Sequence, residues 1–277
     1  MRLRNEANRV DAKFCELSAN GEAALVCYIM AGYPDLKSTE SIIASLVAGG
    51  ADIIEVGIPF SDPIADGPTM QQASFYALEN GMTPRKALKA IQGIRARFPD
   101  LPILAMTYSN IPFKTGIENF LNEAQRAGLD GMILPDMPVE ESESYVNAAR
   151  KLNLCTVFLA SPNTPEPRLR SVVEASSGFV YLVSVYGTTG ARSKVEDYTA
   201  NAIKKAKYAA HLAQKPVAVG FGISTPAHVK FMVGAGADGI IVGSAIIDRI
   251  QENLGNKKLM LSELESFARS MKKACKA

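Results

Sequence analysis

The chain has 277 residues and 47 % of them are hydrophobic, which is enough for one large domain or two small ones around a substantial core. Its 30 basic and 28 acidic residues leave a net charge of +2, so there is no general attraction to nucleic acid or to an acidic membrane surface. Four cysteines without CxxC spacing and only two histidines indicate reduced thiols and no metal site. The charged N-terminal segment lacks the apolar core of a signal peptide, and no run of about 18 apolar residues could span a membrane, so we expect a soluble cytoplasmic protein.

An alternation of helices and strands starts at the N-terminus. Val10, Phe14 and Leu17 form one apolar stripe, which predicts a helix over 5–17. The continuous apolar run over 23–32 is closed by turn-forming residues and is typical of a strand buried on both faces. A second helical pattern begins at Ser38 and ends at Gly49, where glycine can cap it.

The same alternation continues to the end of the chain. Further strands are predicted over 52–57, 102–108, 131–134, 155–160, 179–184, 216–220 and 239–242. Further helices are predicted near 70–80, 84–97, 117–127, 140–152, 166–176, 195–213, 226–235 and 244–253, and in the tail over 256–277.

Eight buried strands, each followed by a helix, are the pattern of an α/β (β/α)8 TIM barrel. We therefore predict a single barrel domain over 1–277, with an extra N-terminal helix and additional helices. A doubly wound open sheet is the alternative. That fold usually has fewer strands, and it often carries a glycine fingerprint after the first strand, which this chain lacks.

A short pattern recurs three times, as AGGADIIEVG at 48–57, AGLDGMILPD at 127–136 and AGADGIIVGS at 235–244. Each copy places glycine at a helix end, then aspartate, then a strand. Glycine caps the helix and aspartate makes the turn into the strand, so the repeat supports βα units and carries no function by itself.

Two glycine-rich stretches follow the last two predicted strands, at 219–225 and 241–246. Glycine there lets backbone N–H groups approach an anion, and the loops after strands seven and eight are the usual phosphate site of a barrel. Gly220, Gly222 and Gly243 could instead only permit tight turns. Because both turns have this character and Ser244 can donate a hydroxyl, we favour a phosphate site.

The stretch IIEVGIPFSDPIADGPTMQQ at 53–72 carries one acid on a strand and others on the loop after it. If Ile54 and Val56 face the helices, strand alternation turns Glu55 into the barrel, near its mouth. Glu55 and Asp66 together indicate acid–base chemistry. Glu55 could instead be a hydrogen-bonded structural carboxylate, and Asp66 could merely assist a helix start.

Three other loop features have less specific interpretations. The loop within YLVSVYGTTGAR at 181–192 is long enough to close over a ligand, with Gly187 and Gly190 as hinges, or it is an ordinary surface loop. Asp62 is explained as a turn residue. Asp136 could be a loop acid or a turn former, and we favour the turn.

These motifs together resemble the tryptophan synthase alpha chain family. The segment IIEVGIPFSDPIADGP at 53–68 is highly specific for that family. Weaker motifs follow the family's order over nearly the whole chain: MAGYPD at 30–35, MTYSN at 106–110, GMILPDMPVEES at 131–142, YLVS at 181–184, GTTGAR at 187–192, VGFGIS at 219–224 and VGSAI at 242–246.

The resemblance implies a lyase that splits indole-3-glycerol phosphate into indole and glyceraldehyde 3-phosphate in L-tryptophan biosynthesis. It also implies an α2β2 complex with a beta chain, which would carry pyridoxal phosphate and join the indole to serine, while this chain would need no cofactor or metal. Carried over by position, Glu55 would be the general acid–base and Asp66 the partner of the indole nitrogen.

The resemblance assigns three further groups of residues. Those that bind the substrate would be Tyr28, Met106, Ile133, Tyr181 and Thr189. Those that bind the phosphate would be Gly190, Phe221, Gly222, Gly243 and Ser244. Those that face the beta chain would be Pro59, Asp62, Tyr108 and Asn110. One departure is Val185-Tyr186, where many members have a basic residue followed by a small one, so loop closure and communication with the partner are less well supported.

Three other functions are alternatives to a lyase that works within a complex. A non-catalytic activating subunit would not need both Glu55 and Asp66, which are intact. A free-standing lyase that releases indole would use the same residues. Another phosphate-binding barrel, such as a sugar-phosphate isomerase, shares the late glycine loops but does not explain the pair of acids.

Overall fold

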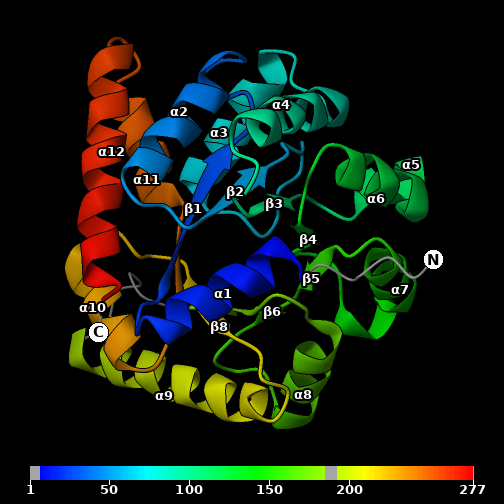
Figure 1. Cartoon of the computed structure of the whole chain (residues 1–277), viewed down its shortest axis with the longest axis vertical. Coiled ribbons are helices and arrows are strands. Elements are labelled where there is room, and N and C mark those ends of the chain that lie inside the picture. The colour runs from blue at the N-terminus through cyan, green and yellow to red at the C-terminus, as the bar shows by residue number, and fades with distance from the viewer. Residues whose placement is uncertain (1–6, 185–191, 277) are drawn as a thin grey trace.

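The computed structural model describes residues 7–184 and 192–276, and for residues 192–196 it describes the backbone only. Its strands run parallel in one sheet, and helices surround that sheet (Figure 1). The strands are β1 (Ala24–Met30), β2 (Ile53–Gly57), β3 (Ile103–Met106), β4 (Gly131–Ile133), β5 (Cys155–Val157), β6 (Leu159–Ala160), β7 (Val180–Val183), β8 (Val217–Gly220) and β9 (Gly239–Val242).

The helices follow the strands in sequence, as the pattern predicts. They are α1 (Arg9–Ala19), α2 (Ser38–Ala48), α3 (Pro68–Glu79), α4 (Pro84–Arg97), α5 (Asn110–Thr115), α6 (Ile117–Arg126), the 3-10 helix η1 (Val139–Glu141), α7 (Glu143–Lys151), α8 (Glu166–Ala175), α9 (Arg192–His211), α10 (Pro226–Gly234), α11 (Ser244–Glu252) and α12 (Lys257–Ala274). None of the helices described is long and apolar enough to cross a membrane.

The strands form a nearly closed barrel. Their order is β5-β4-β3-β2-β1-β9-β8-β7-β6, and the two end strands are separated along the chain by Phe158 alone. The N–H of Phe158 donates to Ser176 Oγ (3.3 Å), and this bond interrupts the predicted strand 155–160. β5 and β6 are thus two halves of one barrel strand. The predicted (β/α)8 barrel is confirmed, and the doubly wound sheet is excluded.

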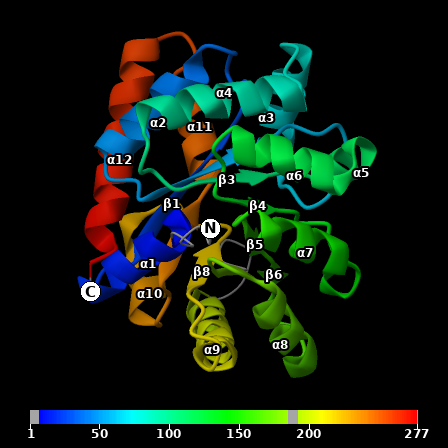
Figure 2. The ribbon, with the colours of Figure 1, turned by 45° about the vertical axis from the view of Figure 1, so that its right-hand side comes forward.

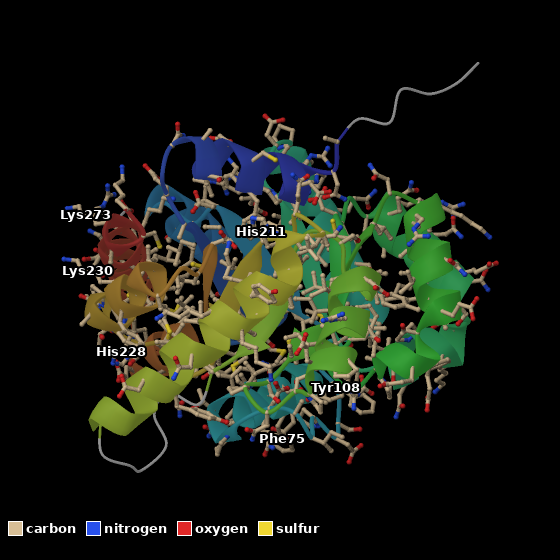
Figure 3. The ribbon with its side chains drawn as sticks, turned by 90° about the horizontal axis from the view of Figure 1, so that it is seen from below. Phe75, Tyr108, His211, His228, Lys230 and Lys273 are labelled. Carbon is tan, nitrogen blue, oxygen red and sulfur yellow. The ribbon has the colours of Figure 1, made fainter. Side chains whose placement is uncertain are left out.

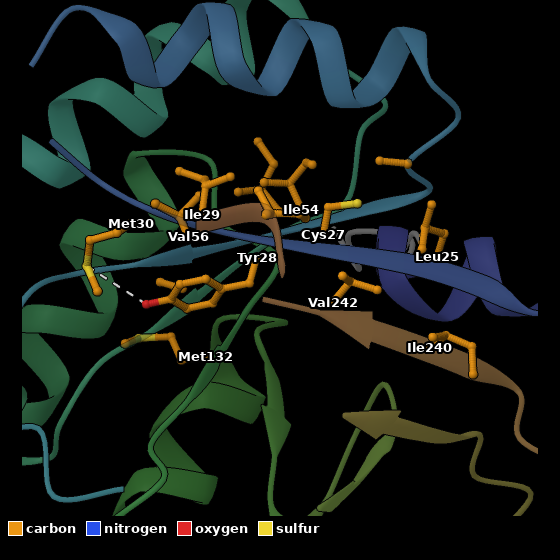
Figure 4. Packing of buried hydrophobic residues seen from close by; sticks show 14 of the residues in the cluster. Leu25, Cys27, Tyr28, Ile29, Met30, Ile54, Val56, Met132, Ile240 and Val242 are labelled. Carbon is orange, nitrogen blue, oxygen red and sulfur yellow. Dashed lines mark hydrogen bonds between the residues drawn. The ribbon is translucent and has the colours of Figure 1, made fainter. Parts of the chain in front are cut away.

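Side chains alternate between two apolar layers, one between the strands and the helices and one inside the barrel. On β1, Cys27 and Ile29 belong to the outer layer, whereas Val26 belongs to the inner one. Figure 4 shows Tyr28 on the opposite side of β1 from Cys27 and Ile29. Alternation along a barrel strand produces this division.

Helix α1 closes the N-terminal end of the barrel. Asn8 caps it by accepting from the N–H of Val10 (2.9 Å), so the helix begins at Arg9, later than the predicted start. Val10, Phe14 and Leu17 pack with the inner layer, and the rings of Phe14 and Phe179 lie 5.5 Å apart. Figure 2 shows α1 in front of the strands, with the helices ringed around them.

The three repeat aspartates share one structural role at this closed end. Asp52, Asp130 and Asp238 each accept a hydrogen bond from the backbone N–H of a neighbouring strand, at Leu25 (2.7 Å), Ile103 (2.8 Å) and Val217 (2.7 Å). Each is also paired with cations, which are Lys272 for Asp52, Arg9 and Arg95 for Asp130, and Lys207 for Asp238. The repeat therefore joins adjacent strands as well as making the turn into each of them.

Helix α5 is absent from the sequence prediction. It has six residues, and Pro112 lies in its first turn, where a missing N–H is tolerated. The strand predicted over 102–108 ends at Met106 instead, which leaves Thr107, Tyr108 and Ser109 to form the link into α5. These link residues are important for the site described next.

Candidate active site

Glu55 lies inside the barrel near the carboxyl end of β2. All five residues of that strand are buried, and Glu55 is level with Tyr28 on β1 and Leu104 on β3. The Glu55 side chain is 1 % exposed, and its Oε2 atom has no hydrogen-bond partner among the residues that the structure describes. Burial, reinforced by the nearby Asp66 carboxylate, raises the pKa of Glu55 to about 8.

Asp66 lies on the loop between β2 and α3 and lines the same cavity as Glu55. Burial raises the pKa of Asp66 to about 6, and a hydrogen bond from the Tyr108 hydroxyl opposes that rise. The same hydroxyl accepts from the backbone N–H of Ala65 (3.0 Å). Near neutral pH the cavity therefore contains one protonated and one ionised carboxyl group.

The cavity has a volume of about 510 Å³. Nine of the residues assigned by position line it: Tyr28, Glu55, Asp66, Met106, Tyr181, Phe221, Gly222, Gly243 and Ser244. Ile133 lines an adjoining cavity of about 240 Å³, which shares Met106, Tyr181 and Phe221 with the first. The two cavities thus meet at one apolar wall.

The glycine-rich loops form another part of the same cavity. Gly222 follows β8, and Gly243 immediately precedes Ser244, the first residue of the nine-residue helix α11. Ser184 Oγ donates to the carbonyl of Phe221 (2.5 Å), which ties the loop after β8 to the end of β7. The N-terminus of α11 opens toward the cavity, and the partial positive charge of a helix N-terminus attracts an anion.

Two buried tyrosines form walls of the cavity. Tyr28 and Tyr181 are 3 % and 6 % exposed, and burial, together with the nearby carboxyl groups, raises the pKa of both. A Cβ atom at Gly57 would overlap the Tyr28 hydroxyl, and one at Gly220 would overlap the Tyr181 hydroxyl. These two glycines therefore leave the space that the tyrosine rings occupy.

The described lining of these two cavities does not include the remaining predicted site residues. Thr189, Gly190 and the Val185-Tyr186 pair are outside the described residues. The four residues assigned to the beta chain differ in exposure: Asp62 and Asn110 are exposed, Pro59 is buried, and Tyr108 is 4 % exposed. Their contact with a partner stays a prediction. Figure 3 shows Tyr108 on the side of the molecule opposite α1.

Several other residues line the cavity and are not among those predicted from the sequence. Ile241 faces inward on β9, and strand alternation could have indicated it. Met70 and Thr69 come from the first turn of α3, and Ser184 follows β7. No local pattern marks them, because their role depends on how α3 and β7 pack against the barrel mouth.

Comparison with known proteins identifies the family. The family described as "Tryptophan synthase alpha chain" matches residues 14–276. This chain belongs to the tryptophan synthase alpha chain family.

Individual relatives agree with that membership. A tryptophan synthase alpha chain of Methanothermobacter thermautotrophicus is 46 % identical over 251 residues, which are 91 % of this chain and 92 % of the relative. The crystal structure of the alpha subunit from Legionella pneumophila has a TM-score of 0.89 at 32 % identity and covers 98 % of this chain and 99 % of that one. A chain from the tryptophan synthase α2β2 complex of Pyrococcus furiosus has a TM-score of 0.83 at 39 % identity, covering 91 % of this chain and 98 % of its own.

Proposed function

We propose that this alpha chain is a lyase that cleaves indole-3-glycerol phosphate to indole and glyceraldehyde 3-phosphate in L-tryptophan biosynthesis. The observation that carries the proposal is the placement of Glu55 and Asp66 in one cavity together with the glycine-rich loops after β8 and β9. The substrate has a ring that needs an apolar wall, a bond that needs acid–base chemistry, and a phosphate that needs an anion site.

The cleavage is a retro-aldol reaction in which two acids have separate roles. Protonated Glu55 donates its proton to C3 of the indole ring, and the positive charge that develops on the ring nitrogen is stabilised by the Asp66 carboxylate. Glu55, now a carboxylate, removes the proton from the adjacent hydroxyl of the glycerol chain. The bond between C3 and that carbon then breaks, its electron pair returns to the ring, and the carbon becomes the aldehyde of glyceraldehyde 3-phosphate.

The remaining assignments follow from the same substrate. The ring would lie among Tyr28, Met106, Ile133 and Tyr181, and the phosphate would bind the N–H groups around Gly222, Gly243 and Ser244 with Phe221 beside it. Thr189 and Gly190, which the resemblance assigns to the substrate and to the phosphate, lie outside the described residues, and their roles are part of this proposal. The whole chain acts as one barrel domain.

The partner of this chain is a tryptophan synthase beta chain in an α2β2 complex, as in the Pyrococcus furiosus relative. In this proposal the alpha chain needs no cofactor, because Glu55 and Asp66 supply the proton transfer and the charge stabilisation. Pyridoxal phosphate belongs to the beta chain. The compartment is the cytoplasm.

The test is a steady-state assay of indole release from indole-3-glycerol phosphate, with and without a beta chain. Glu55→Gln should lower kcat about 10²–10⁴-fold, because the amide cannot transfer the proton, while binding of glyceraldehyde 3-phosphate should persist. Wild-type activity should rise with pH as Asp66 ionises near its pKa of about 6, and fall as Glu55 loses its proton near its pKa of about 8.

Glu22→Gln is the matched control. Glu22 is an acid at the closed end of the barrel, where it pairs with Lys272 (3.1 Å) and Lys276 (3.0 Å). Its replacement should leave kcat and the pH profile unchanged. Near-normal turnover in Glu55→Gln would contradict the mechanism, and a wild-type chain that binds and activates a beta chain without releasing indole would indicate an activating subunit instead.

A further inference from the structure

Asp136 accepts hydrogen bonds from a neighbouring loop, and a residue that only forms a turn would not need these bonds. It follows β4 in the LPDMP segment, and its Oδ1 accepts from the backbone N–H of Ser109 (2.9 Å). Its Oδ2 accepts from Ser109 Oγ (2.7 Å). Ser109 is 9 % exposed and belongs to the link between β3 and α5, so this pair of residues joins the loops after β3 and β4.

Tyr108, the residue before Ser109, extends this connection to a third loop. Its ring stacks on Phe60, with centroids 5.3 Å apart and planes inclined by 24°. Its hydroxyl accepts from the N–H of Ala65 (3.0 Å), the residue before Asp66, and its presence lowers the pKa of the Asp66 carboxyl. The loop after β2 is therefore held by Tyr108, and Tyr108 is adjacent to the serine that Asp136 holds.

We propose that Asp136 is a positioning residue, which fixes Ser109 and through it Tyr108, so that the Tyr108 hydroxyl holds the backbone at Ala65 and thereby sets the place of the Asp66 carboxylate. The inference rests on the proposed function, in which Asp66 stabilises charge on the ring nitrogen. It gives Tyr108 a role within this chain that is separate from any contact with a beta chain.

Asp66 needs such support because it lies on a loop. Ten residues separate the end of β2 from the start of α3, and Ser61, Asp62, Ile64 and Gly67 among them are exposed. Loops are mobile compared with the strands that they connect, and a displacement of about 1 Å in a catalytic group can cost about 100-fold in rate. The bond from the Ala65 N–H to the Tyr108 hydroxyl holds the backbone next to Asp66, and Tyr108 does not line the cavity.

The test is a double-mutant cycle in the full chain with a beta chain, measured by indole release across pH. Tyr108→Phe removes the hydroxyl and keeps the stacked ring, and it should lower kcat about 10- to 100-fold with little change in KM. Asp136→Ala should lower kcat about fivefold. Because both act through one carboxylate, the double variant should lose no more than Tyr108→Phe alone.

The pH profile separates positioning from a general structural defect. Loss of a hydrogen bond to the ionised form raises the pKa of Asp66, so the acid limb should move to higher pH in Tyr108→Phe and, by less, in Asp136→Ala. The other titratable groups that act on this region are Glu55 from β2, Tyr28 from β1 and Tyr181 from β7, and both variants keep these side chains. Asp136 is itself an acid whose charge acts on Tyr108.

Asp35→Ala is the matched control. Asp35 accepts from the backbone N–H of Ser38 (2.9 Å) and from Ser38 Oγ (2.6 Å), which are the same bonds that Asp136 makes, but in the loop after β1. It should leave kcat and the acid limb unchanged. An additive cycle, or an acid limb that stays in place in Asp136→Ala, would overturn the proposal.

A carbon-13 NMR titration of Asp66 tests the positioning independently of activity. The Asp66 titration should move to higher pH in both variants and stay in place in Asp35→Ala. If the wild-type chain released no indole, the proposed function would fail while this titration still decided the positioning. An unchanged Asp66 titration in an active Tyr108→Phe enzyme would reject the positioning and leave the function intact.

Discussion

The two ends of the barrel each bury a carboxylate, and they surround it in opposite ways. At the closed end the side chain of Asp130 is 3 % exposed, and it accepts from Arg9 (2.9 Å), Arg95 (2.6 Å) and the N–H of Ile103 (2.8 Å). At the mouth Glu55 is 1 % exposed, has no cation among the described residues within salt-bridge distance, and has an Oε2 atom without a partner. The two carboxyl groups are thus almost equally buried, but only that of Asp130 is surrounded by cations.

This difference separates a structural acid from a reactive one. Cations and N–H groups around a buried carboxylate favour its ionised form and fix its place, whereas burial without them favours the protonated form. A general acid must be protonated near neutral pH, so the absence of a cation beside Glu55 serves the chemistry that we propose. A second acid, Asp66, further raises the pKa of Glu55.

The largest effect on stability should come from removing the paired acid. Asp130→Ala would leave Arg95 without its carboxylate, and we expect it to lower the free energy of unfolding by about 3–5 kcal/mol. Urea unfolding followed by circular dichroism measures the change. Asp100→Ala, which removes an exposed acid, is the control and should change stability little. A loss below about 1 kcal/mol for Asp130→Ala would show that the paired acid at the closed end does not stabilise the barrel.

Only part of the role of Asp130 could be predicted from the sequence. The repeat of glycine, aspartate and strand correctly predicts βα units, because a cap and a turn are local structures. The cations that pair with Asp130 are 35 and 121 residues away along the chain, and no local pattern connects them. Pairing across such separations depends on the closure of the barrel.

The same distinction applies to the site. Strand alternation alone predicts that Glu55 faces inward, and the glycine loops alone predict an anion site. The role of Tyr108 toward Asp66 depends on three loops that meet at the barrel mouth. Helix α5 fixes one of them, and it is too short for periodicity to reveal. The family resemblance implies that Tyr108 faces the beta chain, which stays a prediction. In the structure Tyr108 is buried, and its hydroxyl accepts from the N–H of Ala65 in the loop that carries Asp66.

The second effect tests the cost of the unpaired acid. The pKa of Glu55 is raised in the folded chain, so the folded state binds the proton more tightly than the unfolded state does, and stability falls as pH rises from about 4.5 to about 8. Glu55→Gln cannot ionise and should therefore be more stable than the wild type above pH 8, by about 2 kcal/mol or roughly 4–8 °C in Tm. Thermal unfolding at several pH values measures the gain.

Glu22→Gln should respond in the opposite direction. Ion pairs with Lys272 and Lys276 lower the pKa of Glu22, so its contribution to stability is present above about pH 4.5 and is lost as pH falls. Replacement should reduce stability near neutral pH and make little difference in acid. If Glu55→Gln were no more stable than the wild type at pH 9, the ionised and unpaired Glu55 carboxylate would not destabilise the folded chain.

The smallest effect should come from the most exposed of the ion pairs that the repeat aspartates make. Lys207 contacts both carboxylate oxygens of Asp238, at 2.7 Å and 2.6 Å, but the two side chains are 38 % and 32 % exposed. Water screens such a pair, so Lys207→Met should lower the free energy of unfolding by less than about 1 kcal/mol, and added salt should shrink the difference. The N–H of Val217 still donates to Asp238 in the variant, so the link between neighbouring strands survives. A loss as large as that of Asp130→Ala would mean that the contribution of these ion pairs to stability does not depend on their burial. The repeat aspartates would then stabilise the barrel chiefly through their cations.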